Sequence, residues 1–282
     1  MKRSIAETLE ARPTMDGAGV RLMRVFGNSE VNRFDPFLLL DDFRSDDPND
    51  YIAGFPWHPH RGMETVSYMI SGKMRHGDSM GNSGVIEGGG IQWMTAGGGI
   101  VHQEMPEQEE GLLWGTQLWV NLPSSSKLMA PRYQDIQPSE VPEVPLEGGG
   151  AVRVLAGAFA DQVGPVKDVI VSPLYLDVEL TGGEKFSLSV SAEKNAFAYL
   201  LEGSGVFAPD ADATQSKHVV RYGPGNEVEV VAGMDGVRFL LVAGKPLKES
   251  VAWRGPIVMN TQEELMEAFE EYRNGTFLKS QK

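Results

Sequence analysis

The chain of 282 residues contains no cysteine, and this absence removes several kinds of chemistry at once. Disulfide bonds, thiolate metal ligands and cysteine nucleophiles are all excluded. Long apolar runs are absent too, and residues Met1–Glu7 have no apolar core of the kind that a signal peptide needs. The sequence therefore predicts a soluble, cytoplasmic protein.

Basic residues are fewer than acidic ones. The chain has 25 Lys and Arg residues against 39 Asp and Glu residues, a formal net charge of −14, and no cluster of basic side chains. Nucleic acids and anionic membranes bind proteins largely through neutralisation of their phosphates, which this chain does not offer. We therefore expect neither nucleic acid nor membrane as a partner, whereas a protein partner is compatible with the acidity.

Glycine and proline are abundant, with 33 and 17 residues, and the hydrophobic fraction is 41%. Short apolar runs alternate with turn residues along most of the chain, with no helical pattern between them, and this arrangement predicts an all-β barrel or sandwich. We interpret 42–50 as an acidic loop and 124–150 as an interdomain connection, within which a short helix or strand is compatible with the sequence. The predicted strands are 20–25, 36–41, 65–70, 91–94, 116–122, 152–159, 174–180, 186–190, 196–201, 227–231 and 237–242.

The pattern changes near the end of the chain. Residues 261–264 (Thr-Gln-Glu-Glu) form a capping box, Leu265, Phe269 and Tyr272 make an apolar stripe, and Gly275 follows as a stop signal. One carboxy-terminal helix is predicted, packed against a barrel.

The two β-rich halves resemble each other. Residues 68–72 (Tyr-Met-Ile-Ser-Gly) resemble 199–203 (Tyr-Leu-Leu-Glu-Gly), and the glycine-rich 88–97 resembles 223–233. Such internal similarity predicts one barrel built twice. We expect an amino-terminal domain at 1–135, a carboxy-terminal domain at 136–260, and the helix at 261–282.

Histidines and carboxylates with alternating spacing point to a metal site. His58 and His60 form an HxH motif, and His102 and Glu104 form an HxE motif. In an extended strand, residues i and i+2 project to the same face, so two adjacent strands would bring the four side chains together. Imidazoles with one carboxylate suit iron, manganese, nickel, copper, cobalt or zinc. The alternative is a polar pocket lined by histidines.

The second half has lost these candidate ligands. At the offset of the repeat, His58 aligns with Ser189, His60 with Ser191 and Glu64 with Asn195, while the HxE motif falls within 237–240 (Val-Arg-Phe-Leu). We therefore expect one metal ion per chain, held by the amino-terminal domain. His76 and His218 are interpreted as surface or hydrogen-bonded residues.

The residues around the two motifs resemble the pirin family. The resemblance rests on seven segments of the first half, which are 58–68, 88–90, 92–97, 99–100, residue 102, 104–106 and 117–122. Pirins are bicupins of the cupin superfamily, so the resemblance implies two tandem cupin domains with a jelly-roll barrel fold.

The family pattern carries over to His58, His60, His102 and Glu104 as ligands, with iron as the metal. Glu64 matches the glutamate that ordinary cupins use and stays an alternative ligand.

The resemblance also implies an activity, quercetin 2,3-dioxygenase, as in bacterial pirins. The substrates would be O2 and a flavonol or another aromatic molecule of that kind, and Glu104 or Glu64 would accept the proton of its hydroxyl group. Aromatic and methionine side chains near the motifs either line the pocket or belong to the core; these are Phe55, Trp57, Trp93, Met94 and Trp119.

A second function is compatible with the same residues. Eukaryotic pirins share the ligand motifs and act as iron-dependent transcriptional co-regulators, so a non-enzymatic metalloprotein with a protein partner is the alternative. A cupin isomerase acting on sugar phosphates is disfavoured, because no basic cluster accompanies the motifs.

Overall fold

The computed structural model describes residues 1–107 and 111–279, which divide into two compact units. One unit, the amino-terminal barrel, contains Pro13–Val31, Phe37–Pro138 and the chain from Leu247 onward. The other unit, the carboxy-terminal barrel, contains Met1–Arg12, Asn32–Pro36 and Ser139–Pro246. The division differs from the expected ranges at both ends of the chain, since each terminal segment groups with the half that is distant in sequence. The boundaries at 135 and 260 stay predictions.

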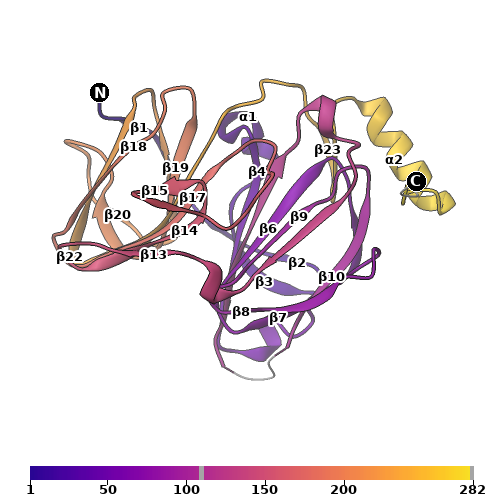
Figure 1. The fold of residues 1–282 in the computed structure, drawn as a ribbon, viewed down its shortest axis with the longest axis horizontal. Coiled ribbons are helices and arrows are strands. Elements are labelled where there is room, and N and C mark those ends of the chain that lie inside the picture. Colours follow the sequence, from indigo (N-terminus) through magenta and orange to yellow (C-terminus); the bar gives the residue numbers. More distant parts are fainter. Residues whose placement is uncertain (108–110, 280–282) are drawn as a thin grey trace. The chain divides into compact units, whose positions relative to one another are not determined.

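The amino-terminal barrel consists of a seven-stranded and a four-stranded antiparallel sheet (Figure 1). The larger sheet has the order β12-β9-β6-β11-β4-β3-β2, and the smaller has the order β5-β10-β7-β8. The larger sheet comprises β2 (Arg12–Asp16), β3 (Val20–Phe26), β4 (Phe37–Ser45), β6 (Met63–Ser71), β9 (Ile91–Thr95), β11 (Leu113–Asn121) and β12 (Arg132–Ile136). The smaller comprises β5 (Phe55–His60), β7 (Lys73–Asp78), β8 (Ser83–Glu87) and β10 (Ile100–Pro106).

The carboxy-terminal barrel is built on one large sheet of order β1-β21-β19-β22-β17-β14-β13, with β18 paired to β22 and β20 to β19. Its interior is apolar and includes Phe186, Phe207 and Phe239. The strands are β1 (Ile5–Glu10), β13 (Glu143–Pro145), β14 (Gly150–Ala156), β17 (Leu174–Leu180), β18 (Lys185–Ser189), β19 (Asn195–Val206), β20 (Thr214–Gln215), β21 (His218–Tyr222) and β22 (Glu227–Gly244). A small hairpin joins β15 (Ala158–Phe159) to β16 (Gln162–Val163).

The repeat predicted from the sequence is present in the structure. Tyr68 in β6 and Tyr199 in β19 are both fully buried, and Gly72 and Gly203 both have positive φ angles, of 83° and 72°. Each tyrosine strand also has equivalent neighbours, since β6 pairs with β9 and β11 and β19 pairs with β21 and β22. The all-β fold with two cupin domains is confirmed.

Strand β22 corrects the prediction of two separate strands at 227–231 and 237–242. It runs without interruption for 18 residues, pairing with β18 in its first part and with β17 in its second. The residues between the two predicted strands belong to β22, and among them Gly236 adopts a φ of 85°. Glycine tolerates this conformation, so the strand can change partner without ending.

The two segments expected outside the main strands, 42–50 and 124–150, both take part in strand pairing. Residues 42–50 do not form a loop throughout, because β4 continues to Ser45 and Asp42 is buried, accepting a hydrogen bond from Trp114 Nε1 at 3.0 Å. The connection at 124–150 contains β12 and β13, which complete a sheet in the amino-terminal and the carboxy-terminal barrel respectively. Strand pairing with distant residues, which composition does not reveal, decides both cases.

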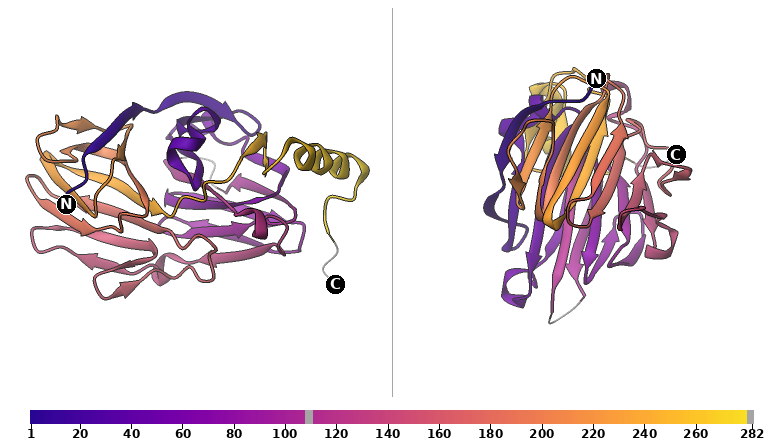
Figure 2. Two further views of the ribbon diagram at one scale, coloured as in Figure 1. Left: turned by 90° about the horizontal axis from the view of Figure 1, so that it is seen from above. Right: turned by 90° about the vertical axis from the view of Figure 1, so that its left-hand side faces the viewer.

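The carboxy-terminal helix α2 (Gln262–Asn274) forms as predicted (Figure 2, yellow). Thr261 and Glu264 make the capping box, and Gly275 ends the helix with a φ of 72°. The helix packs through Leu265 and Ala268 on the small β23–β24 hairpin (Ala252–Arg254 and Ile257–Met259).

The remaining helical elements are short. They are η1 (Asn28–Glu30), α1 (Val31–Phe34), η2 (Pro48–Asp50), η3 (Ser124–Ser126) and η4 (Pro138–Glu140). Within the described ranges, no helix has the length and apolar character to cross a membrane.

Candidate metal centre

Two paired strands of the smaller sheet carry the HxH and HxE motifs. Strands β5 and β10 are antiparallel, and His102 lies directly opposite His58, while Ile100 lies opposite His60. Directly opposed residues share one face of a sheet, and residues two apart in a strand do so as well. This register places three imidazoles on one face.

The three imidazoles lie in contact with one another. Ring centroids are 4.8 Å apart for His58 and His60, 4.4 Å for His58 and His102, and 5.0 Å for His60 and His102. One nitrogen from each ring lies within 4.8 Å of the corresponding nitrogens of the other two. At this spacing the three ring nitrogens can coordinate the same metal ion.

Backbone carbonyls determine the tautomers of two rings. His58 Nδ1 lies 2.8 Å from the Pro56 carbonyl oxygen, and His60 Nδ1 lies 3.3 Å from that of Pro256. A carbonyl oxygen only accepts, so each Nδ1 carries a proton, and in the neutral ring that binds metals each Nε2 presents a lone pair. These two Nε2 atoms are 3.0 Å apart, and two lone pairs at that distance repel each other unless a cation lies against both.

The ring nitrogens of His102 also point to a bound cation. It is 1% exposed, and neither of its ring nitrogens has a hydrogen-bonding partner among residues 1–107 and 111–279. Buried polar atoms without partners are costly and rare in folded proteins. Burial, helped by the neighbouring rings, holds the pKa of His102 and of His60 well below the usual range. Neutral imidazoles are the form that binds metals, so the three residues fit a metal ion.

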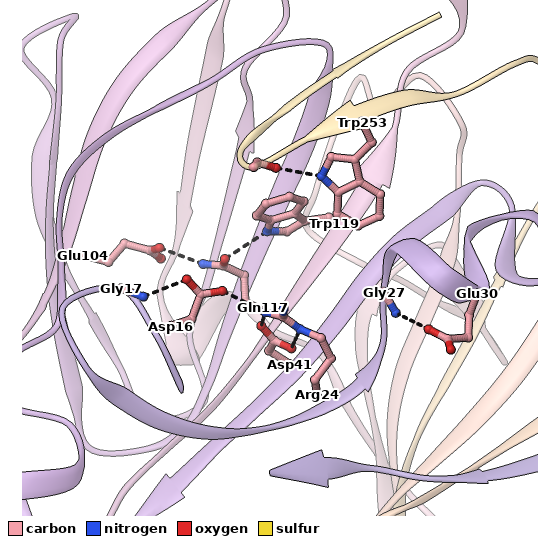
Figure 3. A network of polar contacts seen from close by, with 11 residues as sticks. Asp16, Gly17, Arg24, Gly27, Glu30, Asp41, Glu104, Gln117, Trp119 and Trp253 are labelled. Carbon is pink, nitrogen blue, oxygen red and sulfur yellow. Dashed lines mark hydrogen bonds and ion pairs between the residues drawn. The ribbon is translucent and has the colours of Figure 1, made fainter. Parts of the chain in front are cut away.

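Glu104 lies on the same face of β10 as His102, but its carboxylate is held by the opposite sheet. Ser67 donates its hydroxyl to Oε1 at 2.5 Å, and Gln117 donates its amide to Oε2 at 2.7 Å. Trp119 in turn donates its indole N–H to Gln117 Oε1 at 3.0 Å (Figure 3). The carboxylate is therefore oriented inside the barrel, and it is not part of the contacting imidazole group.

The rival carboxylate, Glu64, lies elsewhere. It is three residues from Ser67 on β6 and therefore projects to the other face of that strand. Its Oε1 accepts a hydrogen bond from Thr95 at 2.6 Å, and burial raises its pKa. The structure does not bring Glu64 together with the imidazoles, whereas it brings Glu104 into the barrel interior with His102.

A cavity of about 620 Å³ opens onto His58 and His60. Of the five side chains expected at the pocket, Phe55, Trp57 and Trp119 line this cavity, and Trp253 and Gln117 join them. Trp93 and Met94 do not line it. Both are buried in the core of the barrel, and Met94 packs with Ala96 and Ile100, so for these two the alternative reading as core residues holds.

Sequence reasoning missed a row of polar residues that crosses the larger sheet. Successive cross-strand partners in six neighbouring strands form this polar row, which consists of Arg24, Asp41, Gln117, Ser67, Gln92 and Asp135. Cross-strand partners share a face, so the row lies on the side from which Ser67 and Gln117 reach Glu104. The available signal was a polar residue at an interior position of several predicted strands, such as Gln117 between Thr116 and Leu118.

The remaining histidines are hydrogen-bonded, as expected. His76 is buried, contacts Tyr133 through its Nδ1, and lies 3.0 Å from Asp135 at the end of the polar row. His218 Nδ1 lies 3.1 Å from the Ser216 carbonyl oxygen. In the described part of the chain, the imidazoles of 58, 60 and 102 are the one group with metal-binding geometry, and none occurs in the carboxy-terminal barrel.

Comparison with known proteins places this geometry in context. The family model for Pirin matches residues 19–120, and the model for the Pirin C-terminal cupin domain matches residues 175–278. A pirin-like protein from Caulobacter vibrioides is 47% identical over 277 residues, which are 98% of this chain and 99% of the relative. A Pseudomonas aeruginosa protein provisionally named quercetin 2,3-dioxygenase is 44% identical over 278 residues, 97% of each chain.

A solved structure has the same architecture. The crystal structure of a quercetin 2,3-dioxygenase from Acinetobacter baumannii superposes with a TM-score of 0.92 at 33% identity, covering 98% of this chain and 99% of that one.

Proposed function

Because this chain belongs to the pirin family, we propose that its amino-terminal barrel binds one iron ion and cleaves a flavonol with dioxygen, as a quercetin 2,3-dioxygenase does. The observation that carries the proposal is the convergence of three imidazoles at the edge of a cavity with aromatic walls. The names of the Pseudomonas and Acinetobacter relatives support the same reaction.

His58, His60 and His102 would hold the ion, with Glu104 as the fourth candidate ligand. The donor set of imidazoles and one carboxylate accepts iron, manganese, cobalt, nickel, copper or zinc. A bound metal would lower the pKa of the flavonol hydroxyl and would supply the redox chemistry with dioxygen. One flavonol and one O2 are converted to one ring-opened ester and one carbon monoxide.

The side chains of the barrel then have separate tasks. The flat substrate packs against the indoles of Trp119 and Trp253, which contact each other with ring centroids 5.7 Å apart, and against Phe55, which also lines the cavity. Glu104 accepts the proton of the 3-hydroxyl group. Ser67 and Gln117 hold its carboxylate in place through charge-assisted hydrogen bonds. Glu64, on the other face of β6, has no part in this scheme.

The test is aerobic incubation of the iron-loaded protein with quercetin, following the loss of quercetin absorbance and the release of carbon monoxide. We expect turnover in the wild type and in His218→Ala, whose histidine lies in the other barrel. His102→Ala should lose both iron and turnover. If no turnover occurs with iron, manganese, cobalt, nickel or copper, the oxygenase proposal fails and a non-enzymatic, metal-dependent regulatory protein becomes the better reading.

A further inference from the structure

A second group of charged residues lines the cavity on a different wall from the imidazoles. Arg24, Asp41 and Asp16 all border it, and we call them the charged wall. Their place follows from the sheet order: β4 and β3 are one and two strands beyond β11, which carries Trp119. The ring of Trp119 contacts His60, with centroids 5.2 Å apart. Strands are spaced by about 4.8 Å, so the charged wall is set back from the imidazoles across the sheet.

The arginine of the charged wall is committed to the two carboxylates (Figure 3). Arg24 Nε donates to Asp41 Oδ1 at 2.9 Å, and its NH2 group donates to Asp41 Oδ2 at 2.7 Å and to Asp16 Oδ2 at 2.8 Å. One positive charge thus faces two negative ones. The wall has a net negative charge, and each carboxylate oxygen keeps a lone pair for one more donor.

The turn that follows Asp16, the last residue of β2, is anchored to Gly54, which directly precedes β5. Gly17 N–H donates to Asp16 Oδ1 at 2.8 Å, and Ala18 N–H donates to the Gly54 carbonyl oxygen at 3.0 Å. A Cβ on Gly17 would lie 2.5 Å from that same carbonyl oxygen and 2.6 Å from the Phe55 ring, so only glycine allows this approach. Asp16 is therefore held at a defined place beside β5.

Together these contacts indicate the chemistry of the part of a ligand that would lie away from the imidazoles, next to the charged wall. The aromatic side chains favour a flat apolar body, and the carboxylates favour hydroxyl donors over acceptors. A carboxylate or phosphate would meet negative charge and an arginine whose Nε and NH2 donors are already occupied. We infer that the cavity selects a neutral aromatic ligand with hydroxyl groups on the ring directed to Asp16 and Asp41. This inference rests on the proposed function, because it concerns the same cavity, and it adds the specificity-determining residues.

Binding without turnover tests the inference. Dissociation constants are measured under nitrogen, by quenching of tryptophan fluorescence of the iron-loaded protein, for 3-hydroxyflavone, galangin, quercetin and 3-hydroxyflavone carrying a 4′-carboxylate. A hydrogen bond to a charged group contributes enough for about a tenfold preference for quercetin over 3-hydroxyflavone. The carboxylate probe should bind more weakly than 3-hydroxyflavone.

Asp16→Asn removes one charge of the wall but keeps the Oδ1 acceptor for Gly17. We expect it to reduce the quercetin preference several-fold, whereas Asp46→Asn, the same change at an exposed site outside the cavity, should leave the preference unaltered. The inference is overturned if the preference persists in Asp16→Asn, or if the carboxylate probe binds as tightly as quercetin.

The two proposals can fail separately. A hydroxyl preference that depends on Asp16, without turnover of any flavonol, supports the inference and contradicts the oxygenase. Turnover without such a preference supports the oxygenase and contradicts the inference about Asp16 and Asp41. If no probe binds, both are wrong.

Discussion

The guanidinium of Arg61 lies over the ring of Phe277, 4.2 Å from its centroid, and donates to the Phe277 carbonyl oxygen at 2.8 Å. Arg61 directly follows the candidate ligand His60, whereas Phe277 lies beyond helix α2. Arg61 also forms an ion pair with Glu271 of that helix, at 2.8 Å. The residues that follow α2, up to Phe277, are therefore attached to the segment that carries the HxH motif.

Phe277→Ala should weaken both the barrel and its metal site. Phe277 is 2% exposed, and truncation of a buried phenylalanine costs about 3 kcal/mol of unfolding free energy. Loss of support behind a ligand lowers metal affinity by about tenfold. Urea unfolding and metal titration measure the two effects. Leu278→Ala is the matched control, because Leu278 is 45% exposed; equal effects of the two variants would contradict the role given to Phe277.

Metal content should be one ion per chain and should depend on His102. At a free metal concentration of about 100 times the dissociation constant, binding adds about 2.7 kcal/mol to the free energy of unfolding. Elemental analysis and thermal unfolding, with and without a chelator, measure these quantities. His102→Ala should lose both the ion and the stabilisation, and His218→Ala neither. Two ions per wild-type chain would contradict the assignment to one barrel.

Gln117→Leu should lower turnover without displacing the metal. The variant removes the amide that donates to Glu104 and the acceptor for Trp119. Hydrogen bonds to charged groups are worth about 1.5–3 kcal/mol, so we expect kcat for quercetin to fall by about tenfold or more. Iron content and kcat are compared with those of Gln103→Leu, which changes the neighbour of Glu104 on the other face of β10. A normal kcat in Gln117→Leu would argue against Glu104 as the base.

Lys127 makes stability depend on pH. Its ammonium is buried and donates to the Gly62 carbonyl at 2.8 Å, to Asn121 Oδ1 at 2.7 Å and to the Val258 carbonyl at 3.0 Å. Burial lowers the pKa of Lys127 from 10.5 to about 8. Between these values the unfolded chain binds more protons than the folded one, so the contribution of Lys127 to unfolding free energy rises with pH in this window.

Lys127→Met should flatten the rise in stability between pH 8 and 10.5, and it should destabilise the protein at pH 7 by about 3 kcal/mol because three buried acceptors lose their donor. Urea unfolding at several pH values measures both effects. An unchanged slope in the variant would mean that Lys127 titrates as it does in the unfolded chain.

Local patterns in the sequence were enough to predict much of the fold. Thr261, Glu264 and Gly275 act through contacts within a few residues, and the helix they delimit is where they place it. The HxH motif works in the same way, since alternation alone puts His58 and His60 on one face. The repeat was visible because Tyr68 and Tyr199 occupy equivalent buried positions next to equivalent glycines.

What could not be predicted depends on pairing between distant strands. The polar row exists only because the register aligns Asp41 with Gln117 and Gln117 with Ser67. Likewise, Trp93 and Trp119 have similar sequence surroundings, yet one is buried in the core and the other lines the cavity. Which face of a strand meets a cavity is a property of the closed barrel.

The carbonyls of Pro56 and Pro256 hold two imidazoles by their Nδ1 atoms before any ion arrives. A rigid set of donors loses little conformational entropy on coordination, which favours tight binding, and because imidazoles with one carboxylate accept several transition metals, metal availability contributes to which ion is held. We therefore expect purified samples to carry whichever ion the growth medium supplied. Comparison of cultures grown with different metal supplements would show how far supply governs occupancy.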